Sequence, residues 1–359
     1  MTMKILTAFD SFKGCITAEE ACRAAAQGIR AALPDATIVQ MPLSDGGEGL
    51  VDCVRRLLPV TPVTLTVHGP LMEPTECTYA LSADGQTAYM ELAAASGLTQ
   101  VPPDRRDPTK TTTYGVGEMM ADALRRGCGK IVMGIGGSAT CDAGQGMLEA
   151  MRDSGCLHTP CQWVVACDVG NPLYGPNGAA YVFAPQKGAT PEQVAWLDRR
   201  LRAFARATEA AGIASPEWAD HPGAGAAGGI GYAFLAYFGA ELRSGIDIVL
   251  DIARFDSELQ EAGLVITGEG KSDGQTLMGK VPHGVLRRCR QAGVPVWLLS
   301  GAIDDASATL SRHFDKVRSI NEGDTRPLSQ LLQPAVATAN LEKTVRQLLL
   351  AFSRRNNGF

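Results

Sequence analysis

Residues 4–41, KILTAFDSFKGCITAEEACRAAAQGIRAALPDATIVQM, contain two short apolar runs separated by a longer helical pattern. The first six of these residues have the apolar character of a buried strand. Across residues 17–33 apolar side chains recur at helical spacing, and Thr17 followed by Glu20 has the pattern of a capping box. Residues 37–41 form the second apolar run. A strand, a helix and a second strand in this order predict a parallel sheet with a crossover helix.

The rest of the chain repeats these patterns, with one change in the middle. Between residues 61 and 92 the β-rich runs are separated only by turn clusters, which predicts an antiparallel section. The fully apolar runs after residue 262 predict a return to parallel winding. The expected strands are 61–67, 76–81, 87–92, 130–135, 163–167, 179–183, 264–267 and 294–299. The expected helices are 49–58, 117–126, 191–211, 233–238 and 281–292.

These elements predict an α/β protein with two α/β domains. A Rossmann-like domain with a parallel sheet would be built from both ends of the chain, residues 1–62 plus 262–359. A second, mixed α/β domain would be inserted as residues 63–261. Open α/β sheets bind ligands at the carboxyl ends of their strands. We therefore expect the active site in the cleft between the two domains.

The composition restricts the class of protein. The 359 residues are 45% hydrophobic and 20% charged, the net charge is −5, and the 33 Lys and Arg residues are scattered. No apolar run approaches the roughly 20 residues that span a bilayer, and the chain enters a strand at once, without a signal-peptide layout. The cysteines have no spacing typical of a zinc site. We expect a cytoplasmic monomer or homodimer that binds small molecules and neither nucleic acid nor membrane.

Glycine-rich acidic turns follow several of the expected strands. They read DSFKG at 10–14, SDGGEG at 44–49 and GEGKSD at 268–273. Glycine lets the backbone approach a phosphate closely, carboxylates bind Mg²⁺, and lysine neutralises phosphate charge. The turns therefore indicate an enzyme that uses Mg²⁺ and a nucleotide, although each also has the composition of a turn with a helix cap.

Residues 134–139, GIGGSA, match the relaxed dinucleotide pattern G-x-G-x-x-A after an expected strand. An NAD site also requires an acid at the end of a second strand about 20 residues later, and no such strand is found there. Backbone amides that hold ATP phosphates fit this loop better. The candidates for this role are Gly134, Gly136, Gly137 and Ser138.

Two later glycine-rich segments are more ambiguous. Residues 223–231 match G-x-G-x-x-G but follow no strand, so Gly225 and Gly228 either bind phosphate or permit close helix packing. Residues 274–280 match most of a P-loop, but Val281 replaces the hydroxyl residue that would bind Mg²⁺. Lys280 nevertheless remains a candidate partner for a phosphate or a carboxylate.

Other polar segments supply the remaining candidates. Residues 111–115, TTTYG, precede an expected helix and suit either an anionic substrate or a helix cap. Asp168 directly follows the expected strand 163–167. Residues 186–188 are expected to form a turn with a solvated Lys187.

Eight segments spread over nearly the whole chain are informative together. They are DSFKG (10–14), DGGEG (45–49), ELAAASG (91–97), TTTYG (111–115), GIGGSAT (134–140), PQKGAT (185–190), PGAGAAGG (222–229) and GEG (268–270). In this order they resemble the bacterial glycerate kinases of the glycerate 2-kinase type. The resemblance implies two α/β domains and phosphorylation of D-glycerate by ATP with Mg²⁺, giving 2-phosphoglycerate.

The chain departs from the family pattern in several places. Residues 141–144 read CDAG where the family usually has NDGG, Gly170 replaces an acid, and Lys271 replaces an arginine. The region 154–162 is shortened by a few tens of residues. Another small hydroxy acid as substrate, or transfer to the 3-hydroxyl, therefore stays an alternative.

A kinase of this kind needs a proton acceptor for the hydroxyl and positive charge near the transferred group. The candidates for the acceptor are Asp10, Asp168 and Asp273, and those for the cation are Lys13 and Lys280. Mg²⁺ would be held among Asp45, Glu48 and Asp142. The other candidates are Glu269 for catalysis and Ser11, Ser96, Thr112 and Thr113 for substrate binding. The competing classes are an NAD-dependent dehydrogenase and a non-catalytic ligand sensor.

Overall fold

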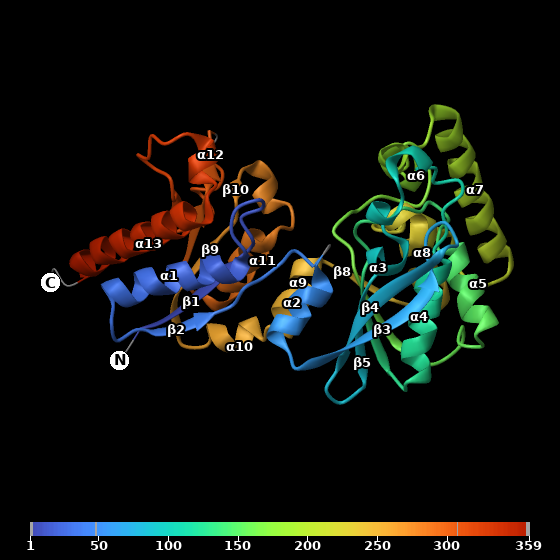
Figure 1. The fold of residues 1–359 in the computed structure, drawn as a ribbon, viewed down its shortest axis with the longest axis horizontal. Coiled ribbons are helices and arrows are strands. Elements are labelled where there is room, and N and C mark those ends of the chain that lie inside the picture. Colours follow the sequence, from blue (N-terminus) through green and yellow to red (C-terminus); the bar gives the residue numbers. More distant parts are fainter. Residues whose placement is uncertain (1–2, 47–48, 307, 357–359) are drawn as a thin grey trace. The chain divides into compact units, whose positions relative to one another are not determined.

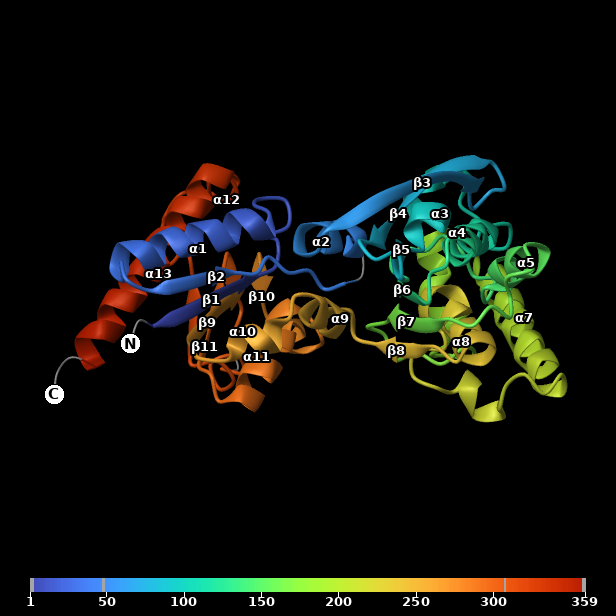
Figure 2. The same cartoon turned by 90° about the horizontal axis from the view of Figure 1, so that it is seen from below.

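The computed structural model describes residues 3–46, 49–306 and 308–356. Its chain forms two compact units, which Figures 1 and 2 show as ribbons. The terminal unit consists of residues 1–45 and 246–359, and the inserted unit consists of residues 46–245. Each unit contains a β-sheet with helices, so the predicted α/β fold class is confirmed.

The sheet of the terminal unit has five parallel strands in the order β13-β11-β9-β1-β2. Strand β1 lies between β2 and β9, and Phe9 at its carboxyl end is opposite Gly268. The parallel sheet predicted from residues 4–41 is therefore confirmed. The strands are β1 (Lys4–Phe9), β2 (Thr37–Gln40), β9 (Ala262–Gly268), β11 (Val296–Ser300) and β13 (Lys316–Ser319), with a separate pair β10 (Lys271–Ser272) and β12 (Ala302–Ile303).

Helices cover both faces of this sheet. Ile5 and Phe9 pack with residues of the first and last helices on one face, and α11 contacts β1, β9 and β11. Figures 1 and 2 show α1 and α13 side by side. Thr17 and Glu20 form the expected capping box at the start of α1. The helices are α1 (Ala18–Ala32), α9 (Gly245–Ile252), α10 (Phe255–Leu259), α11 (Val281–Ala292), α12 (Leu328–Leu331) and α13 (Pro334–Asn356), with the 3₁₀ helix η5 (Gly274–Leu277).

Close packing of α1 on α13 depends on Gly28. A Cβ atom at this position would lie 2.5 Å from the Glu342 carbonyl oxygen and 3.0 Å from Cβ of Val345. Gly28→Ala should therefore push the helices apart and lower the free energy of unfolding by about 1–3 kcal/mol, as overpacking does elsewhere. Denaturant unfolding measures this effect. Gly170→Ala is the matched control, because a Cβ there meets no atom within 4 Å. An unchanged midpoint for Gly28→Ala would refute the packing argument.

The inserted unit contains a six-stranded mixed sheet in the order β3-β4-β5-β6-β7-β8. The first three strands pair antiparallel, and β5 to β8 pair parallel, which confirms the expected antiparallel section. Glu91, Gly134 and Ala166 are aligned at the carboxyl ends of β5, β6 and β7. The strands are β3 (Val60–His68), β4 (Pro74–Ser82), β5 (Thr87–Glu91), β6 (Lys130–Gly134), β7 (Gln162–Ala166) and β8 (Glu241–Arg243).

One expected strand of this unit is a helix. Residues 179–183 form α6, in which Ala179 and Ala180 are buried while Tyr181 and Val182 are exposed. The run is too short for its apolar composition to distinguish a strand from a helix. The helices are α2 (Leu50–Leu57), α3 (Ala93–Ser96), α4 (Tyr114–Arg125), α5 (Gln145–Asp153), α6 (Ala179–Phe183), α7 (Pro191–Ala210) and α8 (Ala226–Phe238). The 3₁₀ helices are η1 (Leu98–Gln100), η2 (Pro103–Arg105), η3 (Pro185–Lys187) and η4 (Pro216–Ala219).

The two units divide the chain after residues 45 and 245, and not at the predicted boundaries 62 and 262. Residues 46–62 belong to the inserted unit, where α2 packs on β4 and β5 and Glu91 accepts hydrogen bonds from the N–H groups of Gly49 and Leu50. Residues 246–261 belong to the terminal unit, where α10 contacts α11. The expected active site between the domains stays a prediction. Among the described helices, none is long and apolar enough to cross a membrane.

Candidate active site

Two neighbouring strands of the terminal unit end in acidic residues at the same edge of the sheet. Phe9 of β1 lies opposite Gly268 of β9, so Asp10 and Glu269 follow on adjacent strands. Both residues are buried, with 8% and 6% of their surface exposed. The N–H of Asp10 donates to the carbonyl of Gly268 at 3.0 Å. The structure thus brings together two of the predicted catalytic residues.

Burial raises the pKa of the Asp10 carboxyl above its ordinary value of 3.8, to about 6. The negative charges of Asp45 and Glu269 act in the same direction. A 2.6 Å hydrogen bond from the Ser11 N–H to Oδ1 of Asp10 and the charge of Lys13 act in the opposite direction. A carboxylate whose pKa is this close to neutral pH is suited to accept a proton from a hydroxyl group.

Glu269 is the centre of a buried hydrogen-bond network. Its Oε1 accepts from the hydroxyl of Ser272 at 3.0 Å and from that of Thr276 at 2.6 Å. The Ser272 hydroxyl is also hydrogen-bonded to the Ser300 hydroxyl at 2.7 Å. Oε2 of Glu269 lies 3.6 Å from Nζ of Lys280, the N-cap residue of α11. The network therefore orients Glu269, which holds the predicted cation Lys280 beside it.

Asp273 makes the contacts of a helix cap. Its Oδ1 accepts from the N–H of Gln275 at 2.9 Å, and its own N–H donates to the Thr276 hydroxyl at 3.0 Å. The ammonium of Lys271 lies 3.7 Å from the same carboxylate. These contacts match the turn-and-cap alternative for residues 268–273.

The three carboxylates expected to hold Mg²⁺ differ in their surroundings. Asp45 lies in the terminal unit and its charge acts on Asp10, whereas Glu48 lies outside the described residues. Asp142, in the inserted unit, accepts hydrogen bonds from the N–H and hydroxyl of Thr113 and from the N–H of Gly144. Over residues 3–46, 49–306 and 308–356, no three His, Cys, Asp or Glu residues form a ready metal site. The negative charges of Asp10 and Asp45 repel each other, and a bound cation would relieve this repulsion. Mg²⁺ that binds together with nucleotide phosphates needs only one or two protein carboxylates.

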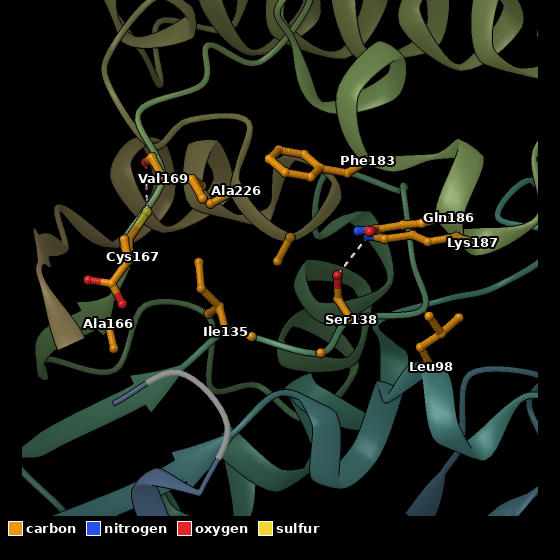
Figure 3. A pocket seen from close by; sticks show the side chains of 14 residues that line it. Leu98, Ile135, Ser138, Ala166, Cys167, Val169, Phe183, Gln186, Lys187 and Ala226 are labelled. Atoms are coloured by element: carbon orange, nitrogen blue, oxygen red, sulfur yellow. Dashed lines mark hydrogen bonds between the residues drawn. The ribbon is translucent and has the colours of Figure 1, made fainter. Parts of the chain in front are cut away.

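The inserted unit contains a pocket of about 450 Å³ beside the carboxyl ends of β6 and β7 (Figure 3). Ser138 lines it in the loop after β6, and Asp168 lines it two residues after the end of β7. The apolar part of the wall includes Leu98, Ile135, Val169 and Phe183. A pocket of this size accommodates a small-molecule ligand. The glycine loop and Asp168, which the sequence analysis singled out separately, thus line one pocket.

The glycine loop presents backbone donors. The N–H of Leu98 donates to the Gly137 carbonyl at 2.8 Å, and the N–H of Ala139 donates to the last carbonyl of α3 at 2.9 Å, so the loop is fixed on both sides. Gly137 has φ +69°, a left-handed conformation that glycine adopts without strain. Within the described part of the chain, the N–H groups of Gly136, Gly137 and Ser138 have no hydrogen-bond acceptor. Such adjacent amides suit the oxygens of an anion.

Asp168 is held at the edge of this pocket by the neighbouring strand. Its Oδ1 accepts from the Ser244 hydroxyl and from the Gly245 N–H, both at 3.0 Å. Ser244 and Gly245 directly follow β8, which pairs with β7. These two contacts fix the direction of the Asp168 side chain.

Lys187 was expected to be solvated, and this expectation is wrong. Only 3% of its surface is exposed, and Nζ donates to the Ser138 hydroxyl at 2.7 Å and to the Thr140 carbonyl at 2.6 Å (Figure 3). Burial lowers the pKa of this ammonium group from 10.5 to about 8. Lys187 follows α6, and the strand that was predicted for residues 179–183 gave no reason to expect the lysine to be buried. The one indication of its importance in the sequence was that it lies in the PQKGAT segment, to which no role was assigned.

Three of the four hydroxyl candidates make contacts within the inserted unit, whereas Ser11 lies in the terminal unit beside Asp10. The Ser96 hydroxyl donates to the Thr112 carbonyl at 3.0 Å, and the Thr112 hydroxyl accepts from the Tyr114 N–H at 3.2 Å. The Thr113 hydroxyl donates to Asp142 at 2.8 Å and accepts from the N–H of Met147 at 3.0 Å. These bonds join the starts of α4 and α5. The N-cap residue Thr113 makes no side-chain cap to its own helix α4, so the helix-cap alternative for residues 111–115 is wrong in that form.

The second glycine segment permits close packing. The N–H of Gly225 donates to the Asn171 carbonyl at 2.9 Å. A Cβ atom on Gly228, which has φ +76°, would collide with the Thr140 carbonyl. This matches the packing alternative for residues 223–231, while the intervening Ala226 and Ala227 line the pocket.

Comparison with known proteins gives one consistent result. The model of the Glycerate kinase family matches residues 5–154 and 154–353, two segments that meet where the sequence analysis places the shortened region. The chain is 40% identical to a glycerate kinase of Bacillus subtilis (strain 168), over 96% of this chain and 97% of the relative. It is also 40% identical to a glycerate 2-kinase of Escherichia coli (strain K12), over 89% of this chain and 90% of the relative.

A solved structure agrees with these relatives. A crystal structure described as a candidate glycerate kinase 2 from Salmonella typhimurium LT2 superposes with a TM-score of 0.84 at 39% identity. The match covers 99% of this chain and 100% of the other. With the family model, the relatives and the fold in agreement, the chain belongs to the glycerate kinase family and is an enzyme of the kinase class.

Proposed function

We propose that this chain transfers the γ-phosphoryl group of ATP to the 2-hydroxyl of D-glycerate in the presence of Mg²⁺, giving 2-phosphoglycerate and ADP. The name of the Escherichia coli relative, a glycerate 2-kinase, supports the choice of hydroxyl. The observation that carries the proposal is that the buried Asp10 and Glu269 follow adjacent strands, with Lys280 beside Glu269. This arrangement supplies a proton acceptor and a cation, the two groups that phosphoryl transfer to a hydroxyl requires.

In the proposed reaction, Asp10 accepts the proton of the 2-hydroxyl as its oxygen forms a bond to the γ-phosphorus. The bond between this phosphorus and the β,γ-bridging oxygen breaks, and ADP leaves with the electron pair. Lys280 offsets the negative charge that develops on the transferred group, and the amides of Gly136, Gly137 and Ser138 hold the nucleotide phosphates. Ser11 and Thr112 remain the candidates for the glycerate carboxylate.

Asp45 is the described carboxylate that best fits the binding of Mg²⁺, because its charge is close enough to act on Asp10. Bound there with the nucleotide, Mg²⁺ would neutralise charge on the β- and γ-phosphates. Asp142 remains the other described candidate, and Thr113 and Gly144 donate to its carboxylate. The cytoplasmic location and the state of the protein as a monomer or homodimer remain predictions.

The proposal is tested by measuring ADP release from MgATP with and without D-glycerate, with enolase present to consume 2-phosphoglycerate directly. We expect glycerate-dependent ADP release with immediate enolase turnover. ADP release without enolase turnover would assign the transfer to the 3-hydroxyl instead. The absence of any glycerate-dependent release would refute D-glycerate as the substrate.

A further inference from the structure

Lys187 is a buried cation that forms no ion pair with a described carboxylate. Its Nζ donates to a hydroxyl and to a carbonyl, both of which are neutral groups. Among the described residues, no carboxylate lies within ion-pair distance of this ammonium, whereas the buried carboxylate of Glu269 has Lys280 beside it. Burying an unpaired charge is unfavourable, so an ammonium group retained at such a position needs a reason.

The position of Lys187 in the pocket supplies that reason. An ammonium group has three N–H donors, and the two bonds to Ser138 and Thr140 leave one donor. Lys187 lines the same pocket as the unpaired amides of Gly136 and Gly137 (Figure 3). A charge and several amide donors therefore converge on one cavity from two separate segments of the chain.

We propose that Nζ of Lys187 binds an anionic oxygen of the ligand in this pocket and that the ligand supplies the ion-pair partner that the described residues do not. The inference rests on the proposed function, which brings two anions to the enzyme, the nucleotide phosphates and the glycerate carboxylate. The apolar wall with Phe183, Val169 and Leu98 suits a nucleotide ring, which favours a phosphate oxygen. Ser138 and Thr140 then position the lysine before the ligand arrives.

The binding of the ligand should be linked to proton uptake. Because the pKa of Lys187 is lowered to about 8, the free protein carries this charge at pH 7 and has largely lost it at pH 9. The ionisable groups that face the lysine are Cys141 and Asp142, and Asp168 lines the same pocket. Burial raises the pKa of the Cys141 thiol to about 11, so this group stays neutral in the range considered. The affinity for an anion should thus fall about tenfold from pH 7 to pH 9.

Calorimetric titration of the full chain with MgADP and, separately, with D-glycerate tests the inference. Lys187→Met should raise the Kd of one of the two ligands by about 10–100-fold at pH 7 and remove the pH dependence of its binding. Loss of MgADP affinity would identify a phosphate, and loss of glycerate affinity would identify the carboxylate. The control is Lys110→Met, which removes an exposed lysine of the same unit that pairs with Asp107. A folded Lys187→Met protein that binds both ligands with unchanged Kd and unchanged pH dependence would overturn the inference.

Two further measurements keep the inference testable if Lys187→Met does not fold. Ser138→Ala retains the cation and removes one of its anchors, so it should raise the same Kd by a smaller factor, about 3–10-fold. The unmodified protein should take up protons when the ligand binds at pH 8, which titration in two buffers of different ionisation enthalpy reveals. No proton uptake, together with an unchanged Kd in Ser138→Ala, would overturn the role of Lys187. Binding of neither ligand to the unmodified protein would instead contradict the proposed function itself.

Discussion

Asp10→Asn is expected to lower kcat by about 10²–10⁴-fold, because asparagine cannot accept the proton of the substrate hydroxyl. The substitution preserves the size of the side chain and a carbonyl oxygen for the Ser11 N–H. In the unmodified enzyme, activity should fall as the pH drops through about 6, where Asp10 becomes protonated. Steady-state kinetics between pH 5 and pH 8 measure both effects. Asp273→Asn is the control, since the contacts of Asp273 are those of a cap. Full activity in Asp10→Asn with loss in Asp273→Asn would reverse the assignment.

The same substitution should stabilise the protein at neutral pH. Because the pKa of Asp10 in the folded chain lies above its ordinary value, the group favours folding below about pH 4, and this contribution is lost as the pH rises through about 6. Above that pH the buried charge opposes folding by up to ~3 kcal/mol, and asparagine removes it. The Tm of Asp10→Asn relative to the unmodified protein should therefore be higher at pH 8 than at pH 5. If the Tm difference between the two proteins were the same at pH 5 and pH 8, the charge of Asp10 would not oppose folding.

Lys280→Met is expected to lower kcat by about 10²–10³-fold, the usual effect of removing a charge that stabilises a transition state. The buried Glu269 holds the Lys280 ammonium at the start of α11, so the charge is in place before the substrates bind. Steady-state kinetics with MgATP and D-glycerate measure the loss. Lys271→Met is the matched control, because Lys271 is 60% exposed and lies beside Asp273 and Asp304.

A double-mutant cycle tests whether Glu269 acts through Lys280. Glu269→Gln preserves the side-chain shape but removes the charge that attracts the ammonium, so it should also reduce kcat. If Glu269 acts only through Lys280, the double variant should be no slower than Lys280→Met alone. Full activity in Lys280→Met, with loss of activity in Lys13→Met, would transfer the role of the cation to Lys13.

Local patterns in the sequence predicted most of the fold. The run Lys4–Phe9, the amphipathic pattern of α1 and the Thr17–Glu20 capping box depend on residues that are close together in the chain. Local patterns could not predict whether Ala179–Phe183 forms a strand or a helix. In the structure this segment is a helix with Ala179 and Ala180 buried. They also could not assign residues 46–62 and 246–261 to the correct unit, because the partners of these segments lie far away in the sequence.

The candidate site follows the same division. Asp10, Glu269 and Asp168 could be found because each follows a strand whose end is visible in the sequence. The burial of Lys187 could not be found, since its partners Ser138 and Thr140 are 49 and 47 residues away. The hydrogen bond between Thr113 and Asp142 was equally hidden, because it joins segments that only the folded sheet brings together.

The discontinuous terminal unit has a consequence for biosynthesis. When the ribosome has added residue 245, the whole inserted unit has been made, but only β1 and β2 of the terminal sheet exist. At this stage β9, which pairs with β1, has not been synthesised. Helix α13, which covers the apolar face of α1, is also still missing. The nascent chain therefore completes its folding from the middle outward, and the apolar face of α1 is the surface that chaperones would protect during the delay.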